Sequence, residues 1–317
     1  MRVLSLAEKF NRGVLVDKKA EAQRFAVNEK TIQRDLEDLR LFFAELYPDD
    51  YTIAIDYVRE QKGYRLHREG HQWLTSEEIL VIAKVLLESR AFPPKEMDGL
   101  LEKLILQAAP EERAHIKQVV LNERFHYISV KHGRSLLKAM WDLSWAVREK
   151  RKVELQYQKA NTLDLIHRTV EPHGIIFSEY YFYLVAYISG KNYEYPAIYR
   201  LDRIHGYEIL DERFKVPYTK CFEEGEFRKR VQFMRPGPIL RIRFRFWGPS
   251  LEAALDRLPT ARVIETEPGG AAVIEAEVYG PGIIMWLLSQ GQFLEVLYPE
   301  SLRGEMKRII NEMKSIY

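Results

Sequence analysis

The chain has 317 residues, of which 46% are hydrophobic and 12% aromatic, which excludes a disordered chain and allows two or three domain cores. The formal net charge of +2 identifies no partner, since residues 1–70 carry 13 basic and 13 acidic side chains, a net charge of zero. If this end binds nucleic acid, its cations must therefore be gathered on one face. The single cysteine, Cys221, excludes a disulfide framework and a cysteine-rich zinc site.

The chain is expected to be cytoplasmic and to have no membrane segment. No apolar run approaches the roughly 20 residues that a membrane-spanning helix needs. Glu8 and Lys9 interrupt the start of the chain where a signal peptide would still be apolar.

The N-terminal end is predicted to form a helix-turn-helix. Residues 2–11 and 18–25 have the apolar spacing of short helices, with Asp17 as the cap of the second. After a tight connection, Asn28 can cap a third, longer helix that runs to about Phe43. Two short helices followed by a turn and a longer amphipathic helix are typical of this DNA-binding motif.

A β-hairpin is predicted directly after these helices. Residues 52–57 alternate in polarity as a strand does, residues 59–63 form a basic tip, and residues 64–67 form the returning strand. A hairpin in this position is a wing, so residues 1–70 are predicted to form a winged helix.

A helical connector is predicted to follow. Either residue of Thr75–Ser76 can pair with Glu78 in a capping box, and Pro93–Pro94 ends the helix that begins there. Two more helices are predicted near residues 96–108 and 135–150. This block is also a candidate dimerisation surface.

The rest of the chain is predicted to be rich in β-structure. Short aromatic strands between residues 151 and 214 indicate a small, strongly curved sheet or barrel, and residues 215–238 an extended or partly helical linker. From residue 239 the order strand, helix, two strands, apolar segment, strand, helix suits helices on one face of an antiparallel sheet. The predicted fold class is therefore multidomain α+β, with the boundaries 1–70, 71–150, 151–214, 215–238 and 239–317.

The third helix carries the candidate DNA contacts. When its apolar stripe faces the core, Lys30 and Arg34 lie about opposite that stripe, four residues apart on one line. The free N–H groups at a helix start suit phosphate, and long donors reach base edges in the major groove. The acidic residues Asp35, Glu37 and Asp38 come later, where pairing within the helix would occupy them. With the hairpin tip, the predicted DNA-binding residues are Asn28, Lys30, Thr31, Gln33, Arg34, Arg59 and Lys62.

The alternative to DNA contact is that this face of the helix is simply exposed to solvent and carries its own ion pairs. For an isolated helix we would prefer that interpretation, but the preceding helix and the wing favour DNA contact.

The stretch from Ala20 to Arg40 resembles the DNA-binding segment of DeoR-like winged-helix bacterial regulators. Thr31, Ile32, Arg34, Asp35 and Leu36 match the T-I-x-R-D-L of their recognition helix.

The middle of the chain resembles the WYL domain, a small Sm-like β-barrel often joined to such a DNA-binding segment. The matching stretches are RTVEPHGIIF, YYFYLVAY and YRLDRI, while the namesake tripeptide is Phe182-Tyr183-Leu184 and Ala197 replaces a frequent arginine. The last segment is similar to the extension that follows WYL domains, and we expect it to be a ferredoxin-like α+β domain. The resemblance implies that the middle domain senses a ligand, nucleic acid among the possibilities.

Arginines with aromatic side chains on a small barrel suit a phosphate-bearing strand or nucleotide. The predicted effector-binding residues are Arg168, His173, Tyr181, Tyr183, Tyr199, Arg200 and Arg203. Because Arg200 and Arg203 have opposite parity along a strand, only one is expected to face a given pocket, and Arg200 is favoured. Alternatively, the tyrosines pack the barrel and Asp202 pairs with a neighbouring arginine.

We therefore expect a ligand-responsive, homodimeric bacterial transcription factor that binds a double-stranded operator, without metal or cofactor, since the histidines show no metal-ligand spacing. One rival is a nucleic-acid-binding accessory protein, for instance in phage defence, that is not a promoter regulator. A second is an enzyme that uses Arg200, Asp202 and His205, although no pair of base and nucleophile is evident.

Overall fold

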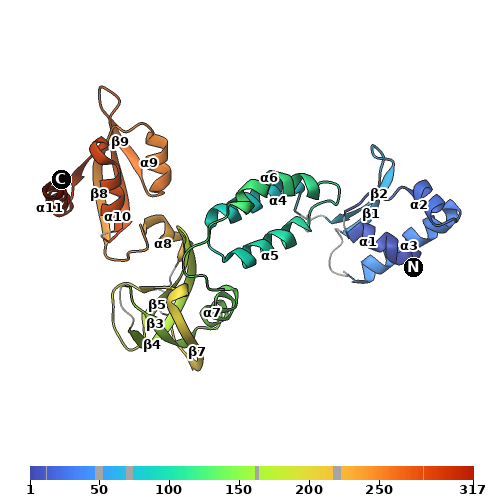
Figure 1. Ribbon diagram of the computed structural model, residues 1–317, viewed down its shortest axis with the longest axis horizontal. Coiled ribbons are helices and arrows are strands. Elements are labelled where there is room, and N and C mark those ends of the chain that lie inside the picture. The colour runs from blue at the N-terminus through green and yellow to red at the C-terminus, as the bar shows by residue number, and fades with distance from the viewer. Residues whose placement is uncertain (12, 47–52, 69–73, 161–163, 217–222, 281) are drawn as a thin grey trace. The chain divides into compact units, whose positions relative to one another are not determined.

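The structure, a computed structural model, describes residues 1–11, 13–46, 53–68, 74–160, 164–216, 223–280 and 282–317 (Figure 1). The chain divides by its internal contacts into two compact units, Met1–Lys131 and His132–Tyr317. Cys221, and Thr52 at the start of the predicted hairpin, lie outside the described residues. The fold is a multidomain α+β fold.

The first unit begins with three helices in the predicted order, α1 (Arg2–Asn11), α2 (Lys18–Arg24) and α3 (Glu29–Leu46). Their apolar stripes meet in one core, in which Leu6, Phe10, Ile32 and Leu36 are at most 1% exposed. Burial of each such side chain contributes roughly 1.5–3 kcal/mol, which makes this small core the main stabilising element of the three helices.

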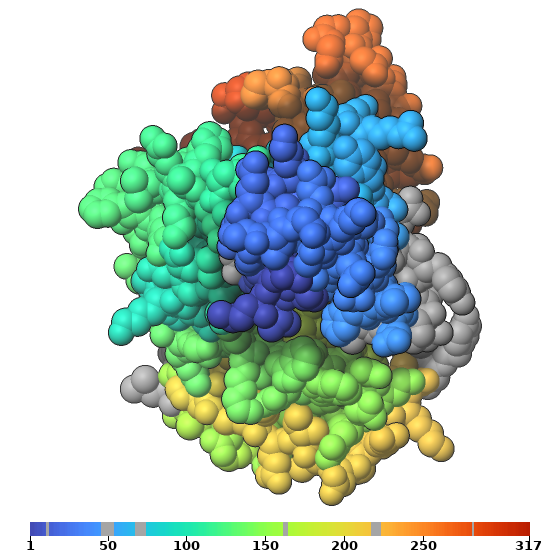
Figure 2. Space-filling model, turned by 90° about the vertical axis from the view of Figure 1, so that its right-hand side faces the viewer, coloured from blue at the N-terminus to red at the C-terminus, as the bar shows by residue number. Residues whose placement is uncertain are grey.

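The predicted hairpin follows as the antiparallel strands β1 (Ile53–Val58) and β2 (Gly63–Arg68). Val58 lies opposite Gly63, so residues 59–62 form the tip. The backbones of Val16 and Tyr64 exchange two hydrogen bonds of 2.8 Å, which fasten the segment before α2 to β2. Figure 2 shows the lighter blue hairpin protruding beside the darker blue helices.

Three further helices pack against one another in the first unit, α4 (Ser76–Ser89), α5 (Pro94–Ile105) and α6 (Arg113–Phe125). The capping box at the start of α4 is confirmed, because Thr75 Oγ1 accepts the Glu78 N–H and Glu78 Oε2 accepts the Thr75 N–H. The Pro93–Pro94 pair does not end α4, which stops at Ser89; Pro94 is instead the first residue of α5.

Helix α6 was not predicted. Its buried positions are only Ile116 and Val120, whereas Val119 and Leu121 are exposed, so no clean apolar stripe stands out in its sequence. The helix predicted near residues 96–108 is α5, which ends three residues earlier than expected.

The second unit opens with α7 (Leu137–Glu149) and a five-stranded antiparallel sheet. Its strands lie in the order β6-β5-β4-β3-β7. Their bounds are β3 (Arg151–Gln158), β4 (Leu165–Ser178), β5 (Tyr181–Ile188), β6 (Ala197–Arg200) and β7 (Ile204–Arg213). Leu143 and Ala146 of α7 join Leu155 and Leu184 of the sheet in one core. The helix predicted near residues 135–150 therefore packs on this sheet.

A four-stranded antiparallel sheet in the order β11-β8-β10-β9 completes the second unit. The elements match the predicted order and are β8 (Ile239–Phe246), α9 (Leu251–Arg257), β9 (Arg262–Thr266), β10 (Ala272–Tyr279), α10 (Gly282–Ser289), β11 (Leu294–Tyr298) and α11 (Glu300–Ile316). Strand β8 turns Ile242 and Phe244 into the core, and its alternate residues Arg241, Arg243 and Arg245 form ion pairs with glutamates.

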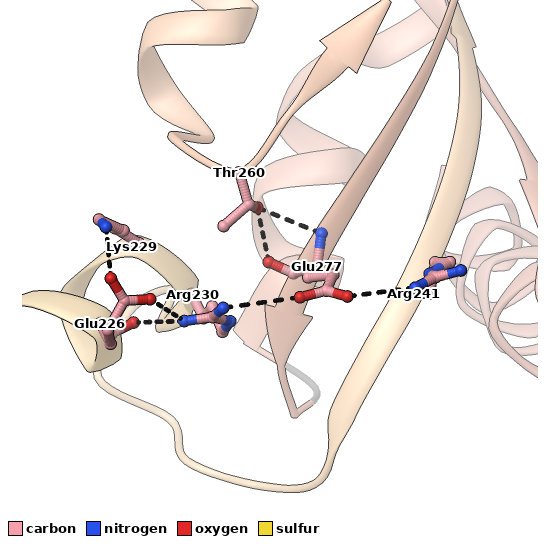
Figure 3. Close-up of polar contacts among 6 residues, drawn as sticks. All are labelled: Glu226, Lys229, Arg230, Arg241, Thr260 and Glu277. Atoms are coloured by element: carbon pink, nitrogen blue, oxygen red, sulfur yellow. Dashed lines mark hydrogen bonds and ion pairs between the residues drawn. The ribbon is translucent and has the colours of Figure 1, made fainter. Parts of the chain in front are cut away.

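The short helix α8 (Glu224–Arg230) is joined to this sheet by a chain of polar contacts (Figure 3). Arg230 donates to the Glu226 carboxylate at 2.7 Å and lies 3.6 Å from the Glu277 carboxylate of β10. Glu277 in turn faces Arg241 of β8 at 3.4 Å, and its backbone exchanges two hydrogen bonds with the Thr260 hydroxyl. These contacts fix α8 against the second sheet.

No helix in the described part of the chain is both long enough and apolar enough to cross a membrane.

Candidate nucleic-acid and effector sites

The start of α3 is built by Asn28. Its Oδ1 accepts the backbone N–H of Thr31 at 2.8 Å and the Thr31 hydroxyl at 2.9 Å, so Asn28 is the predicted N-cap. Both side chains are thereby committed to the geometry of the helix end. Asn28 and Thr31 are themselves predicted DNA contacts, and the role that these hydrogen bonds give them is to fix where α3 begins.

Four of the predicted DNA contacts, Lys30, Arg34, Arg59 and Lys62, are exposed cations without an ion pair or hydrogen bond to any described residue. Lys30 and Arg34 lie on one line of α3, and Arg59 and Lys62 belong to the hairpin tip.

Several other cations of the three helices pair with carboxylates, whereas Lys19 of α2, which is also exposed, has no ion pair in the described chain. Arg2 binds Asp35, Lys9 binds Glu21, and Arg24 also faces Glu21 at 3.3 Å. The Asp35 carboxylate, 5% exposed, is thus held by α1 across the core edge and not by pairing within α3, as the sequence had suggested. Residues 1–70 thus have no net charge, while cations on α3 and at the hairpin tip remain without an ion pair in the described chain.

Gln33 links α3 to the hairpin. Its Oε1 accepts the Tyr64 hydroxyl of β2 at 3.2 Å, and its Nε2 donates to Glu37 at 3.3 Å. Tyr64 was not among the predicted site residues. Its place opposite Tyr57 in a predicted strand pair gave no sign of a bond to a residue 31 positions away.

The second candidate site is a tyrosine–arginine cluster, formed by Tyr181, Tyr183, Arg200, Asp202 and Arg203. Arg200 lies opposite Tyr183 in the sheet register, and its guanidinium carbon lies 3.4 Å from the centre of the Tyr181 ring. Arg200 also donates to both carboxylate oxygens of Asp202, at 3.0 and 2.7 Å. This matches the alternative interpretation of the sequence, in which Asp202 pairs with a neighbouring arginine.

The carboxylate of Asp202, a residue only 8% exposed, does not stand alone in this cluster, because its bidentate bond to Arg200 satisfies both oxygens. Burial raises the pKa of the Tyr183 hydroxyl above its ordinary value, while the Arg200 charge opposes the shift. A guanidinium stacked on one tyrosine and facing another presents the cation and rings that a phosphate with a planar base would use.

Arg200 and Arg203 do not have the opposite parity along one strand that was predicted. Strand β6 ends at Arg200, and residues Leu201–Arg203 form a 3₁₀ turn, so the two arginines do not alternate along one strand. Arg134, which the sequence did not suggest, donates to the Asp202 carbonyl at 2.9 Å and thereby holds this turn.

Three predicted effector residues lie outside the cluster. Tyr199 sits in the core shared with α7 and is 4% exposed, and its hydroxyl has no hydrogen-bond partner of ordinary geometry in the described chain. Burial raises its pKa and the nearby Arg168 charge opposes the rise. His173 contacts the Tyr187 and Phe214 rings, and burial lowers its pKa, with the Lys150 charge acting in the same direction.

The residues considered for an enzyme do not form one reactive group. The Asp202 carboxylate is held by Arg200, whereas His205 Nε2 lies 2.9 Å from Gln158 Oε1. Among the described residues, no three His, Cys, Asp or Glu side chains are placed to hold a metal ion.

Comparison with known proteins assigns both sheets of the second unit. The family model of the WYL domain matches residues 139–209, and that of the WCX domain matches residues 238–314. Over 307 residues the chain is 24% identical to an uncharacterized HTH-type transcriptional regulator, YobV of Bacillus subtilis (strain 168). The match covers 93% of this chain and 92% of the relative.

Two solved structures are also similar. Proteasome accessory factor B/C (PafBC) of Arthrobacter aurescens matches 96% of this chain and 45% of its own at 18% identity, with a TM-score of 0.29. A CRISPR Cas-related protein matches 78% of this chain and 76% of its own at 14% identity, with a TM-score of 0.36. The two family matches and the likeness to an HTH-type regulator along almost the whole chain identify the protein as a WYL-domain transcriptional regulator.

Proposed function

We propose that the protein is a sequence-specific DNA-binding regulator that acts as a homodimer, and that its WYL domain senses a nucleotide or a single-stranded nucleic acid. In this proposal residues 1–70 are a winged helix, 71–150 a helical connector, 151–214 an Sm-like barrel, 215–238 a linker and 239–317 a ferredoxin-like domain. The element order α1, α2, α3, β1, β2 supports the winged helix, and the bulge between Pro172 and Gly174 in β4 supports a bent, barrel-like sheet. The strand order β11-β8-β10-β9 supports the ferredoxin-like assignment.

One observation carries the DNA-binding proposal, namely the distribution of charge. Asp35 and Glu21 are consumed by ion pairs among α1, α2 and α3, whereas Lys30 and Arg34 have no such partner in the described chain. Unpaired cations at the exposed start of a helix provide electrostatic attraction to phosphate without a large net charge. The hairpin-tip cations would contact the neighbouring backbone or minor groove.

The homodimer is supported by apolar side chains that the helical block leaves in solvent. Val81 and Val85 of α4 are 61% and 65% exposed, and Leu121 and Phe125 of α6 are 61% and 81% exposed. A soluble chain rarely leaves such groups uncovered, and two copies joined there would present two winged helices to a pseudo-palindromic site.

The effector proposal draws on the tyrosine–arginine cluster. Arg203 and the stacked Arg200 provide guanidinium groups, and Tyr181 and Tyr183 provide rings and hydroxyls. This combination suits a phosphate beside a planar base.

The double variant Lys30→Ala/Arg34→Ala tests the DNA-binding proposal. Fragments bound by the wild-type chain would be recovered from genomic DNA, and the affinity for them measured at several salt concentrations. Because each lost contact is worth about 1 kcal/mol or more, we expect duplex affinity to fall by at least about 30-fold. The slope of log affinity against log salt should decrease by about 2.

Lys95→Ala/Lys103→Ala is the matched control, since both lysines are exposed on α5 and have no ion pair in the described chain. It removes the same charge and should bind as the wild type does. Equal affinity and equal salt slope in the two double variants would contradict the proposal. An accessory protein of the rival kind would keep its biological effect in the α3 variant.

A further inference from the structure

A cavity of about 370 Å³ lies within the second unit, and no member of the tyrosine–arginine cluster lines it. Its walls come from several elements, namely Tyr187 of β5, Tyr195 in the loop between β5 and β6, Phe227 of α8, Pro236 before β8, and Tyr279 at the end of β10. The volume is in the range of small-molecule sites.

Aromatic rings make up much of the lining of this cavity. The Phe227 and Tyr279 rings lie 5.4 Å apart, centre to centre, and Phe227 is only 5% exposed. Tyr193 and Tyr195 line the cavity from the loop and are 52% and 43% exposed, so their ring faces are not used up in a core. Burial raises the pKa of the Tyr187 hydroxyl, and the neighbouring Tyr279 adds to the rise, so Tyr187 stays neutral there.

The walls are held in place by contacts within the chain. Gly280 donates its N–H to the Pro238 carbonyl at 2.9 Å. A side chain at Gly280 would meet the Pro236 carbonyl oxygen at 2.8 Å, so the segment before β8 packs directly on the end of β10. Arg230 joins α8 to Glu277 of β10 (Figure 3). A cavity that is already formed binds its ligand without the cost of ordering its walls.

The charge of the walls selects the class of ligand. Glu194, Glu223 and Glu226 line the cavity, and among the described residues no lysine or arginine does so. Glu226 is neutralised by Lys229 and Arg230 (Figure 3), whereas Glu194 and Glu223 are exposed and have no ion pair in the described chain. An anion would find no cation in these walls. Aromatic faces beside carboxylates instead attract an organic cation, because the ring faces and the carboxylates are both negative.

We infer that this cavity binds a small organic cation with one or more alkylammonium groups, held by the tyrosine rings and by the carboxylates of Glu194 and Glu223. The ring faces attract the ammonium group and cover its carbon chain, and the carboxylates accept hydrogen bonds from its N–H groups. The site goes beyond the effector cluster proposed above, because its ligand has the opposite charge. Tyr187 belongs to the WYL domain and Tyr279 to the C-terminal domain, so the cation would contact both.

Calorimetric titration of the full chain with spermidine, choline and magnesium chloride tests this inference. Spermidine, which has several ammonium groups, should bind more tightly than choline, and both more tightly than magnesium, which offers the rings no alkyl surface. Glu194→Gln/Glu223→Gln should weaken spermidine binding by at least about tenfold, because two ionic contacts are lost. Glu208→Gln/Glu305→Gln is the matched control and should bind as the wild type does. Both of its glutamates are exposed, have no ion pair in the described chain and do not line the cavity.

Two substitutions of Tyr195 separate the ring from the hydroxyl. Tyr195→Leu should weaken the binding of both organic cations several-fold, whereas Tyr195→Phe should retain it, because the ring face supplies the attraction. Since Tyr195 is 43% exposed, both variants should melt at the wild-type temperature. Binding of choline alone, weakened by Tyr195→Leu, would also support the site and assign it to a quaternary ammonium group.

Three results would overturn the inference. The first is absence of binding by spermidine and choline at millimolar concentration. The second is equal spermidine binding by Glu194→Gln/Glu223→Gln and the wild type. The third is magnesium binding as tight as that of spermidine, because a site built from aromatic rings must prefer the organic cation. None of these results depends on duplex binding by α3.

Discussion

Asn28 caps the start of α3 and is also a predicted DNA contact. Its side chain was predicted both as an N-cap and as a DNA contact, and its Oδ1 is occupied by Thr31. We predict that Asn28→Ala lowers the free energy of unfolding by about 1 kcal/mol, because α3 loses a satisfied N–H at its start. Asn28→Ser should retain most of this stability, since a serine hydroxyl can accept the same bond. Urea denaturation of the three proteins measures the difference, and an Asn28→Ala midpoint equal to that of the wild type would refute the capping role.

We expect His173 to make the stability of the WYL domain depend on pH. Burial lowers its folded-state pKa from the ordinary 6.5, so the unfolded chain binds a proton more readily than the folded chain. The stabilisation is therefore complete above about pH 6.5 and is lost as the pH falls toward the lower folded-state pKa. We predict that His173→Phe, which keeps ring contacts with Tyr187 and Phe214, shows a weaker decrease of the melting temperature between pH 7 and pH 5. Parallel curves for the two proteins in that interval would be the contrary result.

At the level of single side chains, the sequence predicted which residue types would gather but not which partners they would take. The Arg2–Asp35 pair joins positions 33 residues apart, and the Arg134 bond to Asp202 spans 68 residues. No local spacing contains that information, because tertiary packing selects such partners. The seven predicted effector residues accordingly divide between a cluster, a core tyrosine with its neighbouring arginine, and a half-buried histidine.

At the scale of elements, α3 and the hairpin are held together because a side chain of α3 binds the hairpin backbone. Arg40 donates from Nε and Nη2 to the Ile55 carbonyl, at 2.9 and 2.8 Å, and its guanidinium lies 5.8 Å from the Tyr64 ring centre. We predict that Arg40→Met lowers the free energy of unfolding by about 1 kcal/mol, because a charge-assisted bond is lost at a partly exposed site. Duplex affinity should also fall, since the hairpin tip is no longer held beside α3.

Arg34→Met is the matched comparison for Arg40→Met on the same helix. Arg34 has no bond to a described residue, so this variant should unfold at the wild-type denaturant concentration while binding DNA more weakly. Chemical denaturation combined with fluorescence anisotropy separates the two effects. If both variants were equally stable, the bond from Arg40 to the Ile55 carbonyl would not contribute to the free energy of unfolding.

Element order was predicted well wherever capping and periodicity agreed. Residues 239–317 fold in the predicted order, and Thr75 caps α4 as expected. Helix α6 escaped prediction because only two of its residues are buried, and the break between β6 and β7 did so because long-range bonds at Asp202 create the 3₁₀ turn. An element can thus be predicted from its own sequence when it has a wide stripe of apolar residues. When that stripe is narrow, tertiary contacts decide the structure, and the sequence of the element alone does not reveal it.

At the scale of the whole molecule, regulation requires that an effector distinguish two arrangements of the chain. An effector that bound both arrangements equally would leave the DNA affinity unchanged, however tightly it bound. The proposed effector cluster and the proposed DNA-binding face lie in different compact units, so any response must be a coupling free energy between distinct sites.

Coupling of this kind is reciprocal. If a short single-stranded oligonucleotide changes operator affinity by some factor, saturating operator must change oligonucleotide affinity by the same factor, typically about 5–150-fold. Arg200→Met/Asp202→Asn should abolish both changes while leaving basal operator affinity intact. The variant removes the pair together, so no buried charge is left uncompensated in the cluster. Titrations in both directions measure the two factors. Because equal factors are a thermodynamic necessity, unequal factors would mean that a titration had not reached equilibrium, whereas a retained response in the variant would place the sensor elsewhere in the chain.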